Sequence, residues 1–340
     1  FIPVTVVIGF TNGIAVVIFL AQIKDFFGLQ IDNLPAEFFG RIQTLAANAH
    51  TIDLPTLALA STCFIFLLSY NRLAQRFAVL RRAPGPLVVL IVGTLVSFVF
   101  SLPVETIGSR FNGIPQELPN IGFPSLSIHD FGKLISPAIT IALLGAIESL
   151  LSARVADSQI DDRHDPNQEL IAQGLSNIAA PLFGGFAATG AIARTTTNVK
   201  TGGRTPIAGI IHALVLLGIV LIAAPLASYV PLATLSAIVM VVAVNMGEWH
   251  QFKELGRYTY NYRAILLTTF FVTVVFDLTI AVELGMVLAS LFFIYRMSEL
   301  TRIERLPLKD EADEPQFLYP DGSMRIAAWQ LFGSLFFGAV

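Results

Sequence analysis

Charged residues are scarce in this sequence. Asp, Glu, Lys and Arg make up 13% of the 340 residues, about half of the share that soluble domains carry. The apolar and aromatic residues together with cysteine make up 54%, and a soluble fold could not cover its surface with so few charges. The composition therefore excludes a pair of soluble domains and favours a protein whose surface faces lipid.

Cysteine is nearly absent as well, and basic residues are not in excess. Cys63 is the only cysteine, so neither an internal disulfide nor a cysteine-based metal cluster can form. The formal net charge is −3, which provides no basic surface of the size that nucleic acid needs. We therefore expect no nucleic-acid partner, no metal site and no cofactor. The sequence begins at Phe1 inside an apolar run and has no signal-peptide pattern, so we expect further chain upstream.

Long apolar runs are what the sequence has instead. A helix needs about 20 apolar residues to cross a bilayer, and stretches with little or no charge recur along the chain. They lie at 1–23, 54–71, 83–104, 134–152, 170–193, 205–247, 264–276 and 278–295. Because Pro225 and Pro231 divide the longest run, the pattern predicts about nine or ten membrane segments. The amphipathic segment 35–50 predicts a helix at the membrane interface.

Lys and Arg are divided unevenly between the two sets of loops. Most of them lie in alternate loops on one side of the predicted membrane, which places that side and the tail after Arg302 in the cytoplasm. We expect the membrane to be the inner, or plasma, membrane of the cell. Residues 303–325 are polar and predict a linker. Residues 326–340 return to short apolar runs, which predict strands of a small soluble domain.

One acidic side chain lies inside a predicted span. Glu148 belongs to the run LLGAIESLLSARVADS, and an α-helix places Gly145, Glu148 and Ser152 on one face. Ionisable groups inside a bilayer are costly and tend to be functional. Glu148 is therefore a candidate for binding a proton or a cation, with the Ser152 hydroxyl beside it. The structural alternative is an acid that a neighbouring helix end satisfies.

A single Arg follows a run of small residues. The stretch from Gly184 to Gly190 favours an extended crossing, and a helix is predicted from about Ala191 to Val199. The N-terminus of such a helix would present free N–H groups and the positive end of the helix dipole to a cavity. Together with Arg194 it could hold an anion. The alternative is that Arg194 only pairs with an acid on a packed helix face.

One loop is rich in aspartate. The run ADSQIDDRHD contains Asp157, Asp161, Asp162 and Asp165. Such runs beside a span can chelate Mg²⁺ on a diphosphate, as in membrane prenyl transferases, but a diphosphate site generally needs two runs and this chain has one. A solvated cytoplasmic loop is the preferred interpretation.

The sequence resembles the sulfate permease family, SulP, the bacterial relatives of solute carrier family 26. The matching stretches are IPVTVVIGFTNGIAV at 2–16, APGPLVVLIVGT at 83–94, GAIESLLSARVAD at 145–157, the stretch 167–209, VPLATLSAIVMV at 230–241 and FDLTIAVELGMVLA at 276–289. The match over 167–209 is the longest and is highly specific. Residues 326–340 look like the first strands of the cytoplasmic STAS domain of that family.

The resemblance implies an all-α membrane fold of fourteen segments in two inverted seven-segment repeats, with a core domain that moves against a gate domain in elevator fashion. It assigns segments 5–7 of the gate to 1–104, segments 8–14 to 131–298 (core 131–224, gate 228–298), a linker to 303–325 and the start of the STAS domain to 326–340. Segments one to four, which supply half of the core, are then expected upstream.

The resemblance also implies roles for single residues. Glu148 matches the acid of segment eight, and Ser152 matches a hydroxyl that assists cation binding in sodium-coupled members. Gly190, Ala191 and Ile192 match the start of half-helix ten. Sodium-coupled members have Thr where this chain has Ile192 and Asp where it has Glu148, so the match favours a proton over sodium as the coupling ion.

The expected anion site is completed by two further positions. Arg194 matches an arginine that faces the anion in many animal members, whereas Ala193 stands where those members often have Ser. The expected substrate-binding residues are therefore Gly190, Ala191, Ile192, Ala193 and Arg194. The expected coupling residues are Glu148 and Ser152.

Together these observations predict a secondary active anion transporter and not an enzyme. We expect symport of a proton with a small anion, either a dicarboxylate such as fumarate, or sulfate or bicarbonate. The alternatives are a sodium-coupled transporter, an uncoupled exchanger or channel, a nucleobase–cation symporter and a Mg²⁺-dependent membrane prenyl transferase. Arg194 does not suit an uncharged nucleobase. The expected partners are the anion and the lipid bilayer, and a homodimer is left open.

Overall fold

The structure is a computed structural model that describes residues 4–76, 83–116, 121–123, 128–276, 278–300, 302–305 and 329–332. Its helices are α1 (Val4–Ala21), α2 (Ile23–Phe27), α3 (Phe38–Ala47), α4 (Leu54–Arg76), α5 (Gly85–Val99), α6 (Ile107–Phe111), α7 (Ile128–Ile160), α8 (Pro166–Leu182), α9 (Ile192–Lys200), α10 (Ile207–Gly218), α11 (Ala224–Ala227), α12 (Leu232–Met246), α13 (Trp249–Lys253), α14 (Tyr260–Val275) and α15 (Leu278–Leu300). A helical membrane fold is therefore confirmed, while the inverted repeat stays a prediction.

Three helical stretches of the described chain are long and apolar enough to cross a bilayer. They are Val4–Phe27, Phe131–Ile160 and Ile207–Ala227. Shorter apolar helices lie at Leu54–Tyr70, Gly85–Val99, Leu232–Met246 and Tyr260–Val275. The low-charge run 170–193 is divided, as its small residues predicted: α8 ends at Leu182 and the chain from 183 to 191 is not helical. Small residues and glycines explain this break, because they favour turns and extended chain over helix.

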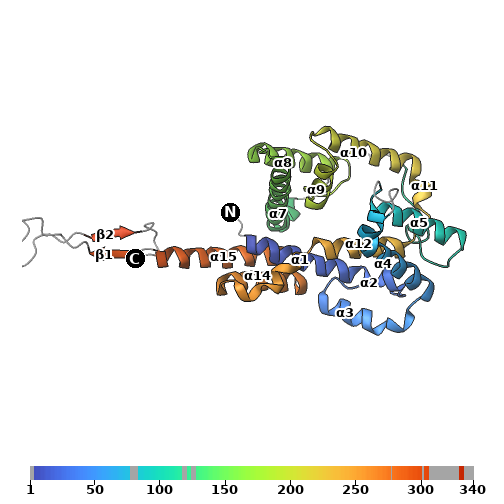
Figure 1. Cartoon of the computed structure of the whole chain (residues 1–340), viewed down its shortest axis with the longest axis horizontal. Coiled ribbons are helices and arrows are strands. Elements are labelled where there is room, and N and C mark those ends of the chain that lie inside the picture. Colours follow the sequence, from blue (N-terminus) through green and yellow to red (C-terminus); the bar gives the residue numbers. More distant parts are fainter. Residues whose placement is uncertain are drawn as a thin grey trace, which may run out of the picture.

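The helices form two groups (Figure 1). Helices α1, α2, α4, α5, α12, α14 and α15 pack against one another, and we call them the large bundle. Helices α7, α8 and α9 pack together on one side of it, and we call them the α7–α9 group. Helix α10 leads from this group towards α11, beside α5 and α12. The grouping resembles the expected division into core and gate, whose boundaries remain predictions.

The large bundle is held together by very close packing of α1 on α14. Gly9 faces the backbone of α14 so closely that a Cβ atom there would lie 2.5 Å from the carbonyl oxygen of Leu266. A second buried cluster joins α4, α5 and α12 through residues such as Ala60, Val89 and Ala237. Small side chains at such contacts let helix backbones approach, as in other membrane proteins.

The amphipathic segment 35–50 contains helix α3, which confirms a helix there. Leu45 of α3 is buried against Leu29 and Ile31, whereas Phe39 and Ile42 are exposed. An exposed apolar face beside a packed one is the pattern that an interfacial helix needs. Its place at the membrane surface remains a prediction.

The tail contains two short strands among the described residues. Strand β1 (Arg302–Arg305) pairs antiparallel with β2 (Trp329–Phe332), and Arg302 lies opposite Phe332. Strand β1 includes the first three residues of the segment 303–325, whose role as a linker stays a prediction. The rest of that linker, and most of the predicted start of a STAS domain at 326–340, lie outside the described residues.

Candidate functional site

The predicted half-helix is present. Helix α8 ends in a turn at Gly184, whose φ of 71° suits glycine. The chain then runs without regular structure to Ala191, whose backbone is extended. Helix α9 follows over Ile192–Lys200, which confirms the helix predicted from about Ala191 to Val199. The sequence could predict this because breaks and helix starts are local features.

Two amide side chains of α8 hold the extended segment. Asn177 Nδ2 donates to the carbonyl oxygen of Ala188 at 2.8 Å, and Asn177 Oδ1 accepts from the Ala188 N–H at 2.8 Å. Gln173 Nε2 donates to the same carbonyl. Our sequence interpretation missed both residues. The signal was present, since Glu169, Gln173 and Asn177 recur every four residues and therefore share one helix face.

Helix α7 holds the end of the same segment. Thr189 Oγ1 donates to the carbonyl oxygen of Gly145 at 2.7 Å. A Cβ atom on Gly190 would lie 3.4 Å from Ser149 Cα and 3.5 Å from Ser152 Oγ. The Ser149 hydroxyl in turn donates to Glu169 of α8. Residues 189–190 are thus fixed against one face of α7, immediately before α9 begins.

Ser152 is the unusual residue of this arrangement. It is 3% exposed, and its Oγ has no hydrogen-bond partner among the described residues. Beside it, Ala191 precedes α9 without a capping side chain, so the first N–H groups of α9 have no acceptor within the helix. Buried hydroxyls are nearly always paired. Within the described residues, a hydroxyl without a partner and a helix N-terminus without a capping side chain form a polar site able to receive an ion.

Glu148 and Arg194 lie on the two helices that border this point. Glu148 is half-buried on α7, one turn before Ser152. Arg194 is exposed in the first turn of α9 and belongs to none of the ion pairs in the described part of the chain. The described ion pairs therefore give no support to the alternative that Arg194 only pairs with an acid on a neighbouring helix. Ile192 is partly exposed at 37%, and the side chain of Ala193 is outside the described part.

The aspartate run shapes the turn between α7 and α8. Asp157 Oδ2 lies 2.6 Å from His164 Nδ1, and Asp165 Oδ1 caps α8 by accepting from the Asn167 N–H at 2.9 Å. Within the described residues no group of three or more acidic, His or Cys side chains is placed to hold a metal ion. These contacts favour a loop that joins α7 to α8 over a Mg²⁺–diphosphate site.

The hydrogen bonds of Asn177 lead to a first prediction. Asn177→Ala leaves the N–H of Ala188 without its partner, which costs about 1–3 kcal/mol of local stability. We expect amide exchange at Ala188 to become about ten-fold faster or more, measured by hydrogen–deuterium exchange. Ser176→Ala is the matched control, because the Ser176 hydroxyl donates to the carbonyl oxygen of Ala172 within α8. Unchanged exchange at Ala188 would contradict the role assigned to Asn177.

Comparison with known proteins gives consistent matches. A family model described as the sulfate permease family matches residues 1–269. The chain is 40% identical over 344 residues to the putative sulfate transporter YvdB of Bacillus subtilis, covering 100% of this chain and 62% of that protein. It is 32% identical over 353 residues to the bicarbonate transporter BicA of Picosynechococcus, covering 99% of this chain and 59% of that protein. The chain thus spans about three fifths of the length of these relatives.

Solved structures agree with the fold. The transmembrane domain of a cyanobacterial bicarbonate transporter BicA aligns with a TM-score of 0.71 at 29% identity, covering 83% of this chain and 70% of that one. The overall structure of SLC26A9 aligns with a TM-score of 0.79 at 20% identity, covering 92% of this chain and 49% of that one. At that identity the second likeness concerns the fold alone. The named relatives are transporters rather than enzymes.

Proposed function

Because the chain belongs to the sulfate permease family, we propose that it is part of a secondary active anion transporter in the plasma membrane. The transporter moves a small anion together with a proton. The α7–α9 group moves against the large bundle in elevator fashion and carries the anion. The relatives' names favour sulfate or bicarbonate, and a dicarboxylate such as fumarate is the third candidate.

The observation that carries the proposal is the hydroxyl of Ser152, which has no partner among the described residues and lies beside the uncapped start of α9. An anion fits at the N-terminus of a helix, where backbone N–H groups and the dipole favour negative charge. Arg194 adds a guanidinium in the first turn, which suits planar or tetrahedral oxyanions. Gly190 and Ala191 leave the backbone open to an anion, while Ile192 and Ala193 contribute N–H groups.

Glu148 is the residue that couples proton binding to anion binding in this proposal. A buried, unpaired charge is costly to move through an apolar environment. When Glu148 takes up a proton, its negative charge disappears and no longer repels an anion near α9. Proton and anion therefore bind more favourably together than either does alone, which is the linkage that symport requires. Ser152 lies one turn away and can donate to a bound ion.

The test is uptake into proteoliposomes that contain the protein carrying this chain. Labelled sulfate, bicarbonate and fumarate are each offered with an inward proton gradient, with a sodium gradient and with neither. We expect one anion to accumulate only with the proton gradient. Glu148→Gln should reduce this accumulation to the level of empty liposomes. Glu254→Gln is the matched control, because Glu254 lies outside the site and pairs with Arg257.

Arg194→Ala tests the anion side separately. Loss of a charged hydrogen-bond donor costs about 1.5–3 kcal/mol, so we expect the KM for the anion to rise by about ten-fold or more. Arg257→Ala is the control, because that side chain is 79% exposed and lies between α13 and α14, outside the site. Uptake that ignores the gradient and survives Glu148→Gln would replace symport with an uncoupled exchanger or channel. Accumulation with sodium alone would show sodium coupling.

A further inference from the structure

Two chain connections join the large bundle to the α7–α9 group. One runs from α5 through α6 towards α7, and the other runs from α11 through residues 228–231 into α12. In Figure 1, α5 and α11 lie close together at one end of the large bundle, and α12 packs against α5. The two connections are far apart in the sequence, yet they meet there.

Backbone hydrogen bonds hold the two connections together. The N–H of Ile107 donates to the carbonyl oxygen of Val230 at 3.0 Å, and the N–H of Leu232 donates to that of Glu105 at 2.9 Å. Between these bonds Thr106 lies opposite Pro231 in an antiparallel bridge. The Gly108 N–H adds a bond of 2.8 Å to the carbonyl oxygen of Ser228. We call residues 105–108 together with 228–232 the clasp.

Side chains fix both halves of the clasp. Thr106 and Ser109 form a reciprocal capping box at the start of α6, which satisfies two N–H groups at once. Val230, Pro231 and Leu232 are buried, so the second half is anchored in the packing of the large bundle. Phe98 of α5 and Tyr229 stack edge to face with ring centres 5.5 Å apart. A paired and buried segment of this kind opens only at a high cost.

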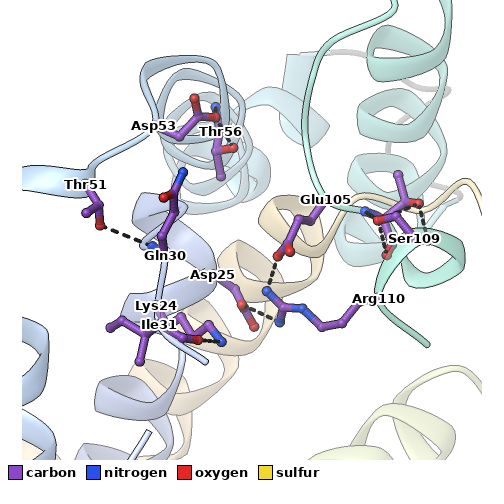
Figure 2. A network of polar contacts seen from close by, with 11 residues as sticks. Lys24, Asp25, Gln30, Ile31, Thr51, Asp53, Thr56, Glu105, Ser109 and Arg110 are labelled. Carbon is purple, nitrogen blue, oxygen red and sulfur yellow. Dashed lines mark hydrogen bonds and ion pairs between the residues drawn. The ribbon is translucent and has the colours of Figure 1, made fainter. Parts of the chain in front are cut away.

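Arg110 ties the clasp to α2 (Figure 2). Its Nη1 lies 2.7 Å from Asp25 Oδ1, and its Nη2 pairs with Glu105. Burial opposes the charge of Arg110, but the hydrogen bonds and the attraction of Asp25 and Glu105 outweigh it, so the pKa of Arg110 lies above its ordinary value. These residues border a cavity of about 830 Å³. These ion pairs add a third anchor to the clasp.

The chain is irregular on the far side of each half of the clasp. After α6, Asn112 and Gly113 have φ values of 57° and 95°. Before α11, residues Ile219–Ala223 form a π-helical turn, a rare feature that interrupts an α-helix and is frequent at functional sites. We call Asn112–Gly113 and Ile219–Ala223 the two joints. The clasp thus lies between two places where the backbone departs from the regular α-helix.

We propose that the clasp is a fixed pivot, which stays closed through the transport cycle while the chain bends at the two joints. A pivot shared by both connections lets the α7–α9 group move as one body, because its first and last connections leave the large bundle from the same point. The inference rests on the proposed function in one respect, namely that the α7–α9 group moves.

Hydrogen–deuterium exchange tests the pivot without any change to the sequence. The protein in liposomes is compared with and without saturating sulfate, bicarbonate or fumarate. We expect equally slow exchange in the clasp amides of Ile107, Gly108 and Leu232, and altered exchange at the two joints. Faster exchange in the clasp amides when the anion binds would overturn the pivot. Equal exchange at both joints under every condition would overturn their assignment.

Disulfide locks provide a test during transport, in a Cys63→Ala background. Thr106→Cys with Pro231→Cys joins opposite residues of a bridge whose Cα atoms lie about 4.5 Å apart in such pairs, within disulfide range. We expect uptake of the transported anion to be equal, within about two-fold, before and after reduction. Uptake that is blocked by oxidation and restored by reduction would show that the clasp opens, and would overturn the pivot.

A second lock bridges a joint. A Cβ atom on Gly113 would lie 3.2 Å from Ser228 Oγ, so Gly113→Cys with Ser228→Cys can tie the joint to the clasp. We expect oxidation of this pair to reduce uptake at least ten-fold, reversibly. Full uptake by its oxidised form would contradict bending at Asn112–Gly113. If the unmodified protein moves no anion with any gradient, the proposed function fails, and the exchange measurements still decide whether the clasp stays closed.

Discussion

Gly190→Val is expected to reduce anion uptake by about a hundred-fold. A Cβ atom at this position would already touch Ser149 Cα at 3.4 Å and Ser152 Oγ at 3.5 Å. The two further methyl groups of valine extend about 1.5 Å beyond Cβ and would push residues 189–191 away from α7. The start of α9 would then move with Arg194, and a displacement of about 1 Å at a binding group costs about a hundred-fold in function.

The control for this prediction is Gly190→Ala. Contacts of 3.4–3.5 Å are ordinary van der Waals distances, so alanine should fit and uptake should stay within about two-fold of the unmodified protein. Initial uptake rates and anion-induced thermal shifts measure the two variants. Equal uptake by Gly190→Val and the unmodified protein would show that the anion does not depend on the contact between Gly190 and α7.

Gly9→Val is expected to destabilise the whole large bundle. The added Cβ would lie 2.5 Å from the carbonyl oxygen of Leu266, 3.1 Å from Thr269 Cβ and 3.3 Å from the backbone nitrogen of Phe270. Two of these obstacles are backbone atoms, so α1 and α14 must separate. Overpacking costs about 1–3 kcal/mol and sometimes more, and here we expect the upper end of that range.

Thermal unfolding in detergent measures this effect. A loss of about 3 kcal/mol corresponds to a midpoint roughly 6–12 °C lower. Gly256→Val is the matched control, because a Cβ atom on Gly256 has no described atom within 4 Å and its midpoint should hardly change. A Gly9→Val midpoint equal to that of the control would mean that α1 and α14 do not pack as closely as described.

The sequence predicted the site only in part. The start of α9 and the extended stretch before it were predictable, because glycine-rich breaks and helix starts depend on neighbouring residues. Helical periodicity grouped Gly145, Glu148 and Ser152 on α7, yet the structure places Gly145, Ser149 and Ser152 against residues 189–190. Periodicity defines a face only to within a residue, and the neighbouring segment decides which side chains meet it.

The polar contacts around the site needed the structure. Asn177 pairs with both backbone groups of Ala188, but nothing in its own neighbourhood shows which segment it meets. In the sequence Ser152 is an ordinary serine, and only the structure reveals that its hydroxyl is buried without a partner among the described residues. The roles of Glu148 and Arg194 as coupling and anion-binding residues stay predictions that the uptake experiments decide.

What the sequence determined by itself was the class of protein. Apolar runs and scarce charge required helices in a membrane, and the stretch 167–209 placed the chain in its family. Only the tertiary structure decided that Gly9 meets Leu266 and that residues 105–108 pair with 228–232. Short stretches of sequence predict which residues share a helix face and where a helix begins or ends. Contacts between distant segments depend on how all helices pack at once, which no short stretch of sequence records.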